Sequence, residues 1–351
     1  MWDDGQPPHR HFIARGGSRE AHWGNRFLKE VWIEKYRPRK LADVVGQPDI
    51  TERLQAYVKQ GNLPHLLFAG RAGVGKTTSA LAMARELFGD KNWHMNFQEF
   101  NASDERGIEV VRQKIKDFAR TAPMGEAQFK IIFLDEADAL TSDAQAALRR
   151  TMERYTKTCR FILSCNYSSK IIDPIQSRCA VFRFRPIPKE AMEEYLKRIA
   201  KEEGVALEQD GLNAITYLAQ GDLRRATNAL QVAAATGKPV DEEVVYQATS
   251  SVHPDRTQEL LKTALQGDFL KARKILDSML IDEGLAGEDI IRAIHKGVFD
   301  LGGIDDRKKV ELVDKIGEVD FRMVEGATER IQLEALLAHF VLVGGESKGK
   351  K

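Results

Sequence analysis

The sequence has few cysteines and no long apolar stretch, and these two absences exclude several classes of protein. Its three cysteines, Cys159, Cys165 and Cys179, form no Cys-x-x-Cys pair, so we expect reduced thiols and neither a zinc site nor a disulfide framework. No apolar run reaches the roughly 18 residues of a membrane-spanning helix, and no signal-type apolar segment follows the N-terminus. We therefore expect an intracellular, cytoplasmic protein with no membrane partner.

Net charge is also nearly absent. The formal value of +1 is the difference between 53 basic and 52 acidic side chains in 351 residues. A polyanion would therefore have to be bound through a local basic surface, because the field of the whole molecule is weak. The length is sufficient for two or three domains, each with its own core.

A glycine-rich segment at residues 70–78 reads Gly-Arg-Ala-Gly-Val-Gly-Lys-Thr-Thr. It matches the pattern Gly-x4-Gly-Lys-[Ser/Thr], in which small residues let backbone N–H groups surround phosphate oxygens in front of a helix N-terminus. The apolar residues from His65 to Ala69 predict the strand that precedes such a loop. We expect ATP phosphates to be bound by Gly70, Arg71, Ala72, Gly73, Val74, Gly75, Lys76, Thr77 and Thr78.

A second motif consists of an apolar run from Ile131 to Leu134 followed by Asp135 and Glu136. A buried strand that ends in two carboxylates places one near a bound Mg²⁺ and the other where it polarises an attacking water. We expect Thr77 and Asp135 to hold Mg²⁺ and Glu136 to activate the water. Together with the glycine-rich loop, this motif predicts ATP hydrolysis, whereas alone it would also fit a capped strand end.

Short apolar runs alternate with helical stretches as far as about Arg185, which is typical of a parallel α/β sheet. The helix that follows the Asp-Glu strand opens with Ser142 and Gln145, the spacing of a capping box. The expected strands are Leu66 to Ala69, Phe97 to Asn101, Ile131 to Leu134, Phe161 to Ser164 and Val181 to Phe184, and the expected helices are Lys76 to Leu87, Gly107 to Ala119 and Asp143 to Tyr155.

After Pro186 and Pro188 the strands stop, and the remainder reads as amphipathic helices interrupted by glycines. We therefore expect an α/β fold followed by an all-α part. The expected segments are a tail at 1–29 that is either disordered or not the natural start, a nucleotide-binding core at 30–186, a small helical domain at 187–249, a second helical module at 250–344 and a polar tail at 345–351.

Two further polar residues follow or precede predicted strands. Asn166 comes after the strand that ends at Ser164, where an amide can hydrogen-bond both the γ-phosphate and the attacking water; it could equally cap a turn. Arg178 comes just before the last strand, and taken alone it reads as a surface arginine.

Several motifs outside the loop resemble the small subunit of archaeal replication factor C, a clamp-loader family of AAA+ ATPases. The resemblance extends from Glu30 to about Phe340. One departure is Arg71-Ala72, where the family usually has two prolines; because backbone amides bind the phosphates, we expect affinity to survive. The matching motifs are Val31-Trp32-Ile33-Glu34-Lys35-Tyr36-Arg37-Pro38, Asn101-Ala102-Ser103-Asp104-Glu105-Arg106-Gly107, Leu148-Arg149-Arg150-Thr151-Met152-Glu153 and Ser177-Arg178-Cys179. A further segment, Gly221-Asp222-Leu223-Arg224-Arg225-Ala226-Thr227-Asn228, resembles the lid motif of AAA+ proteins in general.

This resemblance implies an AAA+ parallel-sheet core, a small helical lid and a C-terminal helical collar through which subunits assemble. It implies that Arg178 acts in trans, in the nucleotide site of a neighbouring subunit, and that Arg224 reaches from the lid to the γ-phosphate. The implied partners are a replication factor C large subunit, further copies of this chain, the PCNA sliding clamp and primer-template DNA, so that the working protein would be nucleoid-associated. The residues implied around adenine and ribose are Tyr36, Arg37 and Pro38, with Val44 or Val45.

The predicted helix from Gly107 to Ala119 is a candidate DNA contact. Arg112 and Lys116 are four residues apart and share a face, and Arg106 precedes them. Such residues would bind phosphates without reading bases. The alternative is an ordinary solvated face, because acidic residues lie on the same segment.

Two other functions remain open at this point. Another AAA+ DNA motor, such as a branch-migration helicase or a helicase loader, would share the core but should carry a DNA-binding winged helix or a pore loop in place of a collar. A nucleotide-binding scaffold subunit without turnover is the second alternative, and the intact Lys76, Thr77, Asp135 and Glu136 argue against it.

Overall fold

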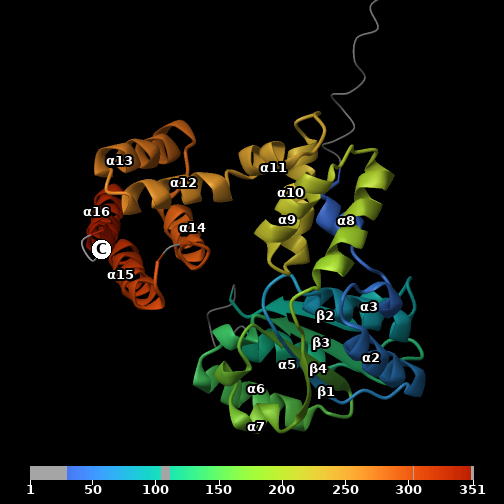
Figure 1. The fold of residues 1–351 in the computed structure, drawn as a ribbon. Coiled ribbons are helices and arrows are strands. Elements are labelled where there is room, and N and C mark those ends of the chain that lie inside the picture. The colour runs from blue at the N-terminus through green and yellow to red at the C-terminus, as the bar shows by residue number, and fades with distance from the viewer. Residues whose placement is uncertain (1–29, 104–110, 303, 349–351) are drawn as a thin grey trace, which may run out of the picture.

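The computed structural model describes residues 30–103, 111–302 and 304–348, with residues 111–112 and 346–348 described by their backbone only. Within these ranges the helical lid lies between the sheet-containing core and the C-terminal helical module (Figure 1). That module, whose helices run from Pro254 to Lys348, is called the collar below. Among the described residues, none of the helices combines the length and the apolar character needed to cross a membrane.

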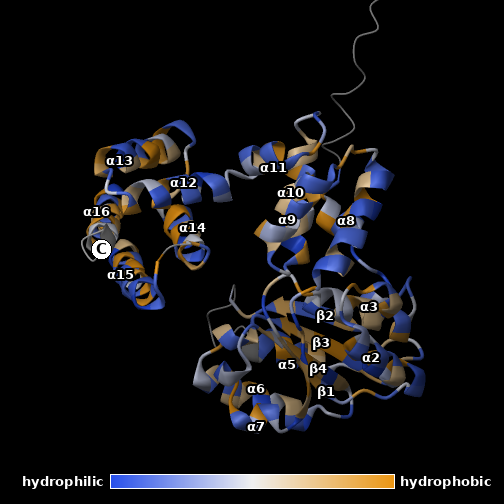
Figure 2. Cartoon of the chain, viewed as in Figure 1, coloured by the Kyte–Doolittle hydropathy of each residue, from blue (hydrophilic) through white to orange (hydrophobic). Residues whose placement is uncertain are grey.

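Five parallel strands form the core sheet of the described chain, in the order β2-β3-β4-β1-β5. Neighbouring side chains on a strand enter different apolar clusters: Leu66 and Phe68 pack on one face of the sheet, and Leu67 and Ala69 on the other. In Figure 2 the sheet is accordingly largely apolar, whereas the lid and collar helices show both colours. The predicted strands are confirmed with slightly different ends, as β1 His65–Ala69, β2 Phe97–Asn101, β3 Lys130–Asp135, β4 Cys159–Cys165 and β5 Cys179–Arg183.

Helices and short turns connect the strands. The predicted helix over 107–119 is described only from residue 111, where a π-helical turn leads into α5. The α-helices are α1 Trp32–Lys35, α2 Pro48–Gln60, α3 Lys76–Phe88, α5 Lys116–Arg120, α6 Ser142–Arg154 and α7 Asp173–Gln176. The other turns are η1 Leu41–Asp43, η2 Trp93–Met95, η3 Val111–Ile115, η4 Ala137–Ala139 and η5 Ser168–Lys170.

The N-terminus of α6 differs from the prediction. Its capping residue is Thr141, whose hydroxyl accepts a hydrogen bond from the Ala144 amide at 3.3 Å. Gln145 is buried, and its amide group donates to the carbonyl oxygens of Leu140 and Lys170 at 3.1 and 2.9 Å. The predicted capping box at Ser142 is therefore wrong, because Gln145 satisfies loop groups beside the helix instead of the helix's own first amides.

The lid consists of four helices, between Lys189 and Thr249, around one apolar cluster. Helix α1 packs into the same cluster. Trp32 of α1 is buried in this cluster, and its backbone N–H donates to Gln231 Oε1 at 3.1 Å. A segment that the sequence places with the core thus packs mainly on the lid. The lid helices are α8 Lys189–Glu203, α9 Gln209–Ala219, α10 Leu223–Ala234 and α11 Glu242–Thr249.

The chain therefore crosses between lid and core twice, once after α1 and once between β5 and α8. Gln47, which is buried, joins the two crossings: its side-chain amide donates to the carbonyl oxygens of Arg185 at 2.7 Å and of Val74 at 3.3 Å. Val74 belongs to the glycine-rich loop. Gln47 thus bonds the segment that leads into the lid to the glycine-rich loop.

The collar has a separate apolar cluster that extends from Val252 to Val343. It meets the lid through ring contacts: His253 lies 4.6 Å from the Tyr246 ring centre, and the Lys296 ammonium lies 5.0 Å from that of Tyr217. The collar elements are α12 Pro254–Leu265, α13 Phe269–Asp277, the π-helical turn η6 Ser278–Asp282, α14 Gly287–Phe299, α15 Asp306–Val324 and α16 Glu329–Lys348.

Candidate functional site

The glycine-rich loop connects the end of β1 to the start of α3 at the carboxyl edge of the sheet. Gly73 and Gly75 have φ angles of 69° and 98°, which favour glycine because a side chain would be strained there. No side chain caps the N-terminus of α3. Its first amides are therefore available to an anion, and the helix dipole favours negative charge at this end.

Lys76 is the first residue of α3 and is buried. Its ammonium group donates to the carbonyl oxygens of Gly70 at 2.5 Å and Arg71 at 2.8 Å, and to Asn166 Oδ1 at 3.3 Å. Burial lowers the pKa of Lys76, although the nearby Asp135 carboxylate opposes this shift. Among the described residues this buried cation is hydrogen-bonded to uncharged oxygens alone, which fits a site for phosphate.

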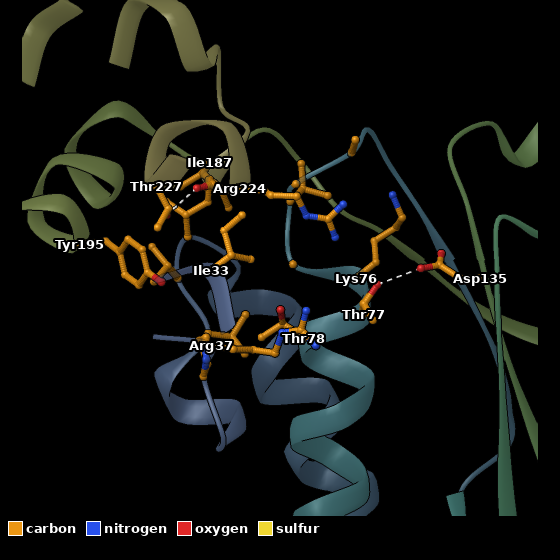
Figure 3. Close-up of a pocket in the computed structure, with 18 of the residues that line it drawn as sticks. Ile33, Arg37, Lys76, Thr77, Thr78, Asp135, Ile187, Tyr195, Arg224 and Thr227 are labelled. Atoms are coloured by element: carbon orange, nitrogen blue, oxygen red, sulfur yellow. Dashed lines mark hydrogen bonds between the residues drawn. The ribbon is translucent and has the colours of Figure 1, made fainter. Parts of the chain in front are cut away.

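Thr77 and Asp135 lie together beside Lys76. The Thr77 hydroxyl donates to Asp135 Oδ2 at 3.1 Å, as the close-up in Figure 3 shows. The described residues contain no cluster of three or more His, Cys, Asp or Glu side chains placed to hold a metal ion. One hydroxyl and one carboxylate nevertheless fit Mg²⁺, which binds hard oxygens and usually combines one or two protein ligands with nucleotide phosphates and water.

Glu136 and Asn166 complete the polar side of the pocket. Glu136 adopts the left-handed conformation, with φ 52°, and its side chain is among those that line the cavity. The Asn166 backbone N–H donates to Asp138 Oδ2 at 3.2 Å, while its side-chain oxygen faces Lys76. The amide of Asn166 is thus held next to the loop cation, where a phosphate would lie.

The cavity has an empty volume of about 960 Å³, including its open mouth, and lies between the core and the lid. Arg224 from the lid and Lys76 from the loop both extend into it (Figure 3). The predicted site residues that line it are Arg37, Pro38, Val44, Val45, Ala72, Gly73, Val74, Gly75, Lys76, Thr77, Thr78, Asp135, Glu136, Asn166 and Arg224.

Tyr36 is placed differently from the expectation, because its side chain does not line this cavity. Its hydroxyl donates to Glu203 Oε1 at 2.6 Å, and its carbonyl oxygen accepts from the Tyr195 hydroxyl at 3.1 Å. Burial, reinforced by the Glu203 carboxylate, raises the pKa of Tyr36 to about 12. Tyr36 therefore attaches α1 to the lid, while its neighbour Arg37 faces the cavity.

Five lining residues were not predicted from the sequence, and all come from α1, the lid or the connection into it. Ile187 and Tyr195 belong to the apolar cluster of the lid, and Leu223 packs against it. Their amphipathic pattern predicts core positions and does not show that they also face a cavity. The five residues are Ile33, Ile187, Tyr195, Leu223 and Thr227.

The lid also touches the glycine-rich loop directly. The Leu223 backbone N–H donates to the Gly73 carbonyl oxygen at 3.0 Å. A Cβ atom on Gly73 would lie 1.7 Å from Asp222 Oδ1, the atom that caps α10 by accepting from the Arg225 amide. Only glycine fits at this point, so the N-terminus of α10 rests on the loop.

Two predicted loop residues lie outside the cavity lining. Gly70 and Arg71 contribute carbonyl oxygens to Lys76, as described above. The Arg71 side chain is exposed and lines a smaller pocket on the other side of the loop, together with Asp222 and Arg225. Of the two residues that depart from the family pattern, Arg71 thus lines only the smaller of these two pockets, whereas Ala72 lines both.

Arg178 lies at the opposite edge of the sheet from its own cavity. It precedes β5, whose first residue, Cys179, is in register with His65 at the start of β1. The glycine-rich loop follows the other end of β1, five residues further on. At about 3.3 Å per residue this separation is roughly 16 Å, which is farther than an arginine side chain extends.

The DNA-face candidates are only partly described. Arg106 lies outside the described residues, and Arg112 is described by its backbone alone, within the π-helical turn η3. Lys116 is exposed at the first position of α5.

Three family models match consecutive parts of the chain. The ATPase family associated with various cellular activities (AAA) matches residues 66–187, the RCF1/5-like AAA+ ATPase lid domain matches 194–235, and the replication factor C C-terminal domain matches 252–339. A replication factor C small subunit of Methanocella arvoryzae is 62% identical over 90% of this chain and 97% of its own length. One of Archaeoglobus fulgidus is 60% identical over 88% and 97%.

The chain belongs to the replication factor C small-subunit family. This confirms the resemblance drawn from the motifs, together with an AAA ATPase core, a lid and a replication factor C C-terminal domain.

The solved structures that are similar include the RuvB Holliday junction branch migration motor of Thermotoga maritima. It matches with a TM-score of 0.52 and 18% identity, over 72% of this chain and 86% of that one. At this identity the likeness concerns the fold alone. It shows that the two chains share a fold over most of their length.

Arg224 and Arg225 form a matched pair for testing the lid side of the site. We expect Arg224→Ala to weaken ATP binding by about tenfold or more, because it removes a charge-assisted hydrogen bond, and to weaken ADP binding less. Arg225→Ala changes the smaller pocket that Arg71 and Asp222 also line, and should leave both affinities unchanged. Titration of the full-length chain with fluorescent ATP and ADP analogues measures this; equal losses for the two variants would contradict the assignment.

Proposed function

We propose that this chain is the ATPase subunit of a clamp loader that opens the PCNA sliding clamp and loads it onto primer-template DNA during replication. The observation that carries the proposal is the separation of two halves of a site. The loop and lid face one edge of the sheet, and Arg178 stands at the other, so that a complete site needs a neighbouring subunit. Membership of the replication factor C family supports the same assembly.

The chain's own residues would act on ATP at the carboxyl edge of the sheet. Lys76 holds the β- and γ-phosphates, Glu136 accepts a proton from the attacking water, and Asn166 orients that water. Thr77 and Asp135 would hold Mg²⁺, which supplies positive charge next to the phosphates. Arg224 adds a second cation from the lid, so that lid position and phosphate occupancy depend on each other.

Arg178 would act in trans on a neighbour's nucleotide. Its guanidinium is 41% exposed, and its distance from its own loop leaves an adjacent subunit as the source of the phosphate it would meet. Arginines that stabilise charge on a transferred phosphoryl group are worth roughly 10³ to 10⁵ in rate in GTPases. Closing of the subunit interface would then control hydrolysis.

The collar offers a surface for this assembly. Val310, Phe321 and Val324 of α15 are 66 to 70% exposed. At 100° per residue they fall on one side of the helix, together with the exposed Gly317. Apolar side chains gathered on one face of an exposed helix are typical of an interface between subunits. The proposed partners there are further copies of this chain and the large subunit.

DNA would be contacted from the helix that contains Arg112, Lys116 and, before it, Arg106. The exposed position of Lys116 on α5 supports this proposal, and several copies in an arc would place such residues along successive phosphates. Binding of this kind depends on salt and not on sequence.

The two alternatives receive less support. A branch-migration or helicase-loading motor is favoured by the RuvB likeness in fold only, while residues 252–339 match the replication factor C C-terminal domain. A scaffold without turnover is disfavoured because Lys76, Asp135 and Glu136 surround one cavity.

Glu136→Gln tests whether this chain hydrolyses ATP. In the complex assembled with the large subunit, we expect turnover to fall by about 10²-fold or more, because a general base is removed, while ATP binding persists. Glu190→Gln, an exposed substitution on α8, is the control. Unchanged turnover in the Glu136 variant would assign the chain to the scaffold alternative.

Arg178→Ala tests the action in trans. ATP affinity should stay the same, while DNA- and clamp-stimulated hydrolysis falls by about 10²-fold or more. Complexes that mix Arg178→Ala chains with Glu136→Gln chains should regain part of the activity. In some of their interfaces the intact Glu136 of one chain then meets the intact Arg178 of its neighbour. Normal stimulated turnover in the Arg178 variant, or no recovery in mixtures, would contradict this role.

The DNA face can be tested by reversing its charge. Arg112→Glu with Lys116→Glu should flatten the dependence of DNA affinity on salt by about 0.9 in log–log slope for each phosphate that is no longer neutralised. Lys59→Glu, at the exposed end of α2, should leave the slope unchanged. Fluorescence anisotropy of the assembled complex at several salt concentrations measures it, and identical slopes would move the DNA contact to another surface.

A further inference from the structure

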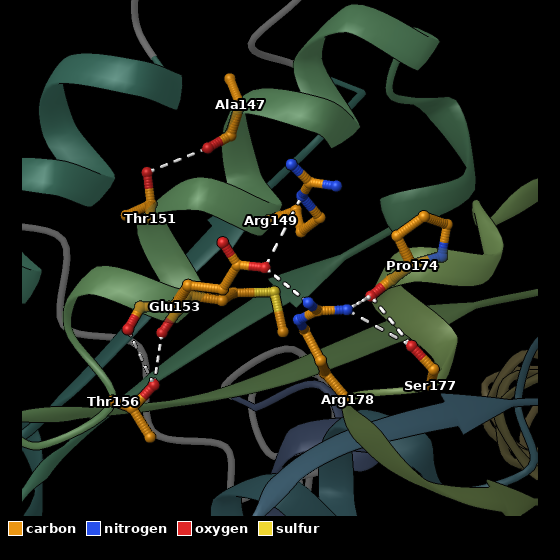
Figure 4. A network of polar contacts seen from close by, with 9 residues as sticks. Ala147, Arg149, Thr151, Glu153, Thr156, Pro174, Ser177 and Arg178 are labelled. Carbon is orange, nitrogen blue, oxygen red and sulfur yellow. Dashed lines mark hydrogen bonds and ion pairs between the residues drawn. The ribbon is translucent and has the colours of Figure 1, made fainter.

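The Arg178 guanidinium is held at two points by its own chain. Its Nη2 lies 2.7 Å from Glu153 Oε1, and its Nη1 donates to the Pro174 carbonyl oxygen at 2.7 Å. A third, longer contact joins Nη1 to the Ser177 hydroxyl at 3.4 Å. Figure 4 shows the guanidinium between the last turn of α6, which carries Glu153, and α7, which carries Pro174. Two separate helices thus fix the orientation of one exposed side chain.

Glu153 is shared with a second arginine. Arg149, one turn earlier on α6, approaches the same carboxylate oxygen with its Nε at 3.7 Å. That Nε is buried and, among the described residues, has no hydrogen-bond partner. Two guanidinium groups therefore share one carboxylate, which leaves a surplus positive charge at this edge of the sheet.

The geometry leaves donors of Arg178 available. A guanidinium has five N–H groups in a planar fork, and the contacts above use the two Nη atoms. Within the described residues the Nε–H of Arg178 donates to no oxygen. A phosphate of a neighbouring subunit could therefore be met without breaking the ion pair to Glu153.

Such a pair is weak as a stabilising element but effective as an orienting one. Glu153 and Arg178 are each 41% exposed, and exposed ion pairs contribute little to stability. Yet a long arginine side chain loses considerable rotamer freedom when it is fixed. Because the carboxylate already fixes the arginine, the side chain loses less rotamer entropy when it binds a phosphate.

We propose that Glu153 is a positioning residue that orients Arg178 for the nucleotide of the neighbouring subunit. This inference rests on the proposed trans action of Arg178. It assigns a role in that action to Glu153, which lies outside both the glycine-rich loop and the nucleotide cavity. Glu153 touches neither the nucleotide nor the reacting atoms, and it acts only through Arg178.

A double-mutant cycle on the complex assembled with the large subunit tests the proposal. Glu153→Gln should lower the single-turnover rate of DNA- and clamp-stimulated ATP hydrolysis about tenfold, less than the roughly hundredfold that a 1 Å misplacement can cost. ATP affinity should be unchanged, because Glu153 does not line its own chain's cavity. In an Arg178→Ala background, Glu153→Gln should cause no further loss.

Two matched variants complete the cycle. Glu153→Asp keeps the charge but retracts it by one methylene, and should give an intermediate rate. Glu193→Gln removes an acidic partner of similar ion pairs on α8, with Lys189 and Lys197, and should leave the rate unchanged.

The results separate this inference from the proposed function. If Arg178→Ala lowers the rate but Glu153→Gln does not, or raises it, positioning by Glu153 is overturned and the trans arginine stands. An equal loss from Glu153→Gln in the Arg178→Ala background would show a general structural role and overturn it as well. If Arg178→Ala itself has no effect, the trans role fails and the inference fails with it.

Discussion

A buried ammonium group bonded only to uncharged oxygens is the constraint on which the rest of the site depends. The Lys76 side chain is withdrawn from water at the first position of α3, and burial disfavours its charged form. Carbonyl and amide oxygens lessen this cost but do not neutralise the charge. Around the Lys76 ammonium lie the uncapped end of α3, the Thr77–Asp135 pair and Arg224 of the lid. Each of them suits the binding of a polyanionic ligand.

Much of the fold could be predicted because its signals are local. Buried parallel strands are short apolar runs, and the glycine-rich loop has a fixed spacing, so both could be read from consecutive residues. The residues that were missed or misplaced depend on packing between distant segments. Tyr36 bonds Glu203, some 167 positions away, and Gln145 turns toward residues near 170 instead of its own helix end. Periodicity cannot reveal such partners, because it records which face is apolar and not what lies against that face.

The family relationship and the structural likeness answer different questions. Relatives near 60% identity over most of the chain establish the family, whereas the likeness to RuvB at 18% identity concerns the fold alone. After residue 250 the described chain has five α-helices around a separate apolar cluster. Residues 252–339 of this part match the replication factor C C-terminal domain, so the family relationship includes the collar as well as the core.

The insertion of Trp32 into the lid changes how the lid is anchored. A lid joined to its core by one peptide segment could swivel about that segment, and a single cut would release it. Here the N-terminal helix is embedded in the lid, and Gln47 bonds the returning chain to the outgoing one at Arg185. Two chain segments tied side by side therefore join the lid to the core, and both would have to change for the lid to turn. A protease cut near residue 186 would consequently leave the lid in place, docked on Trp32.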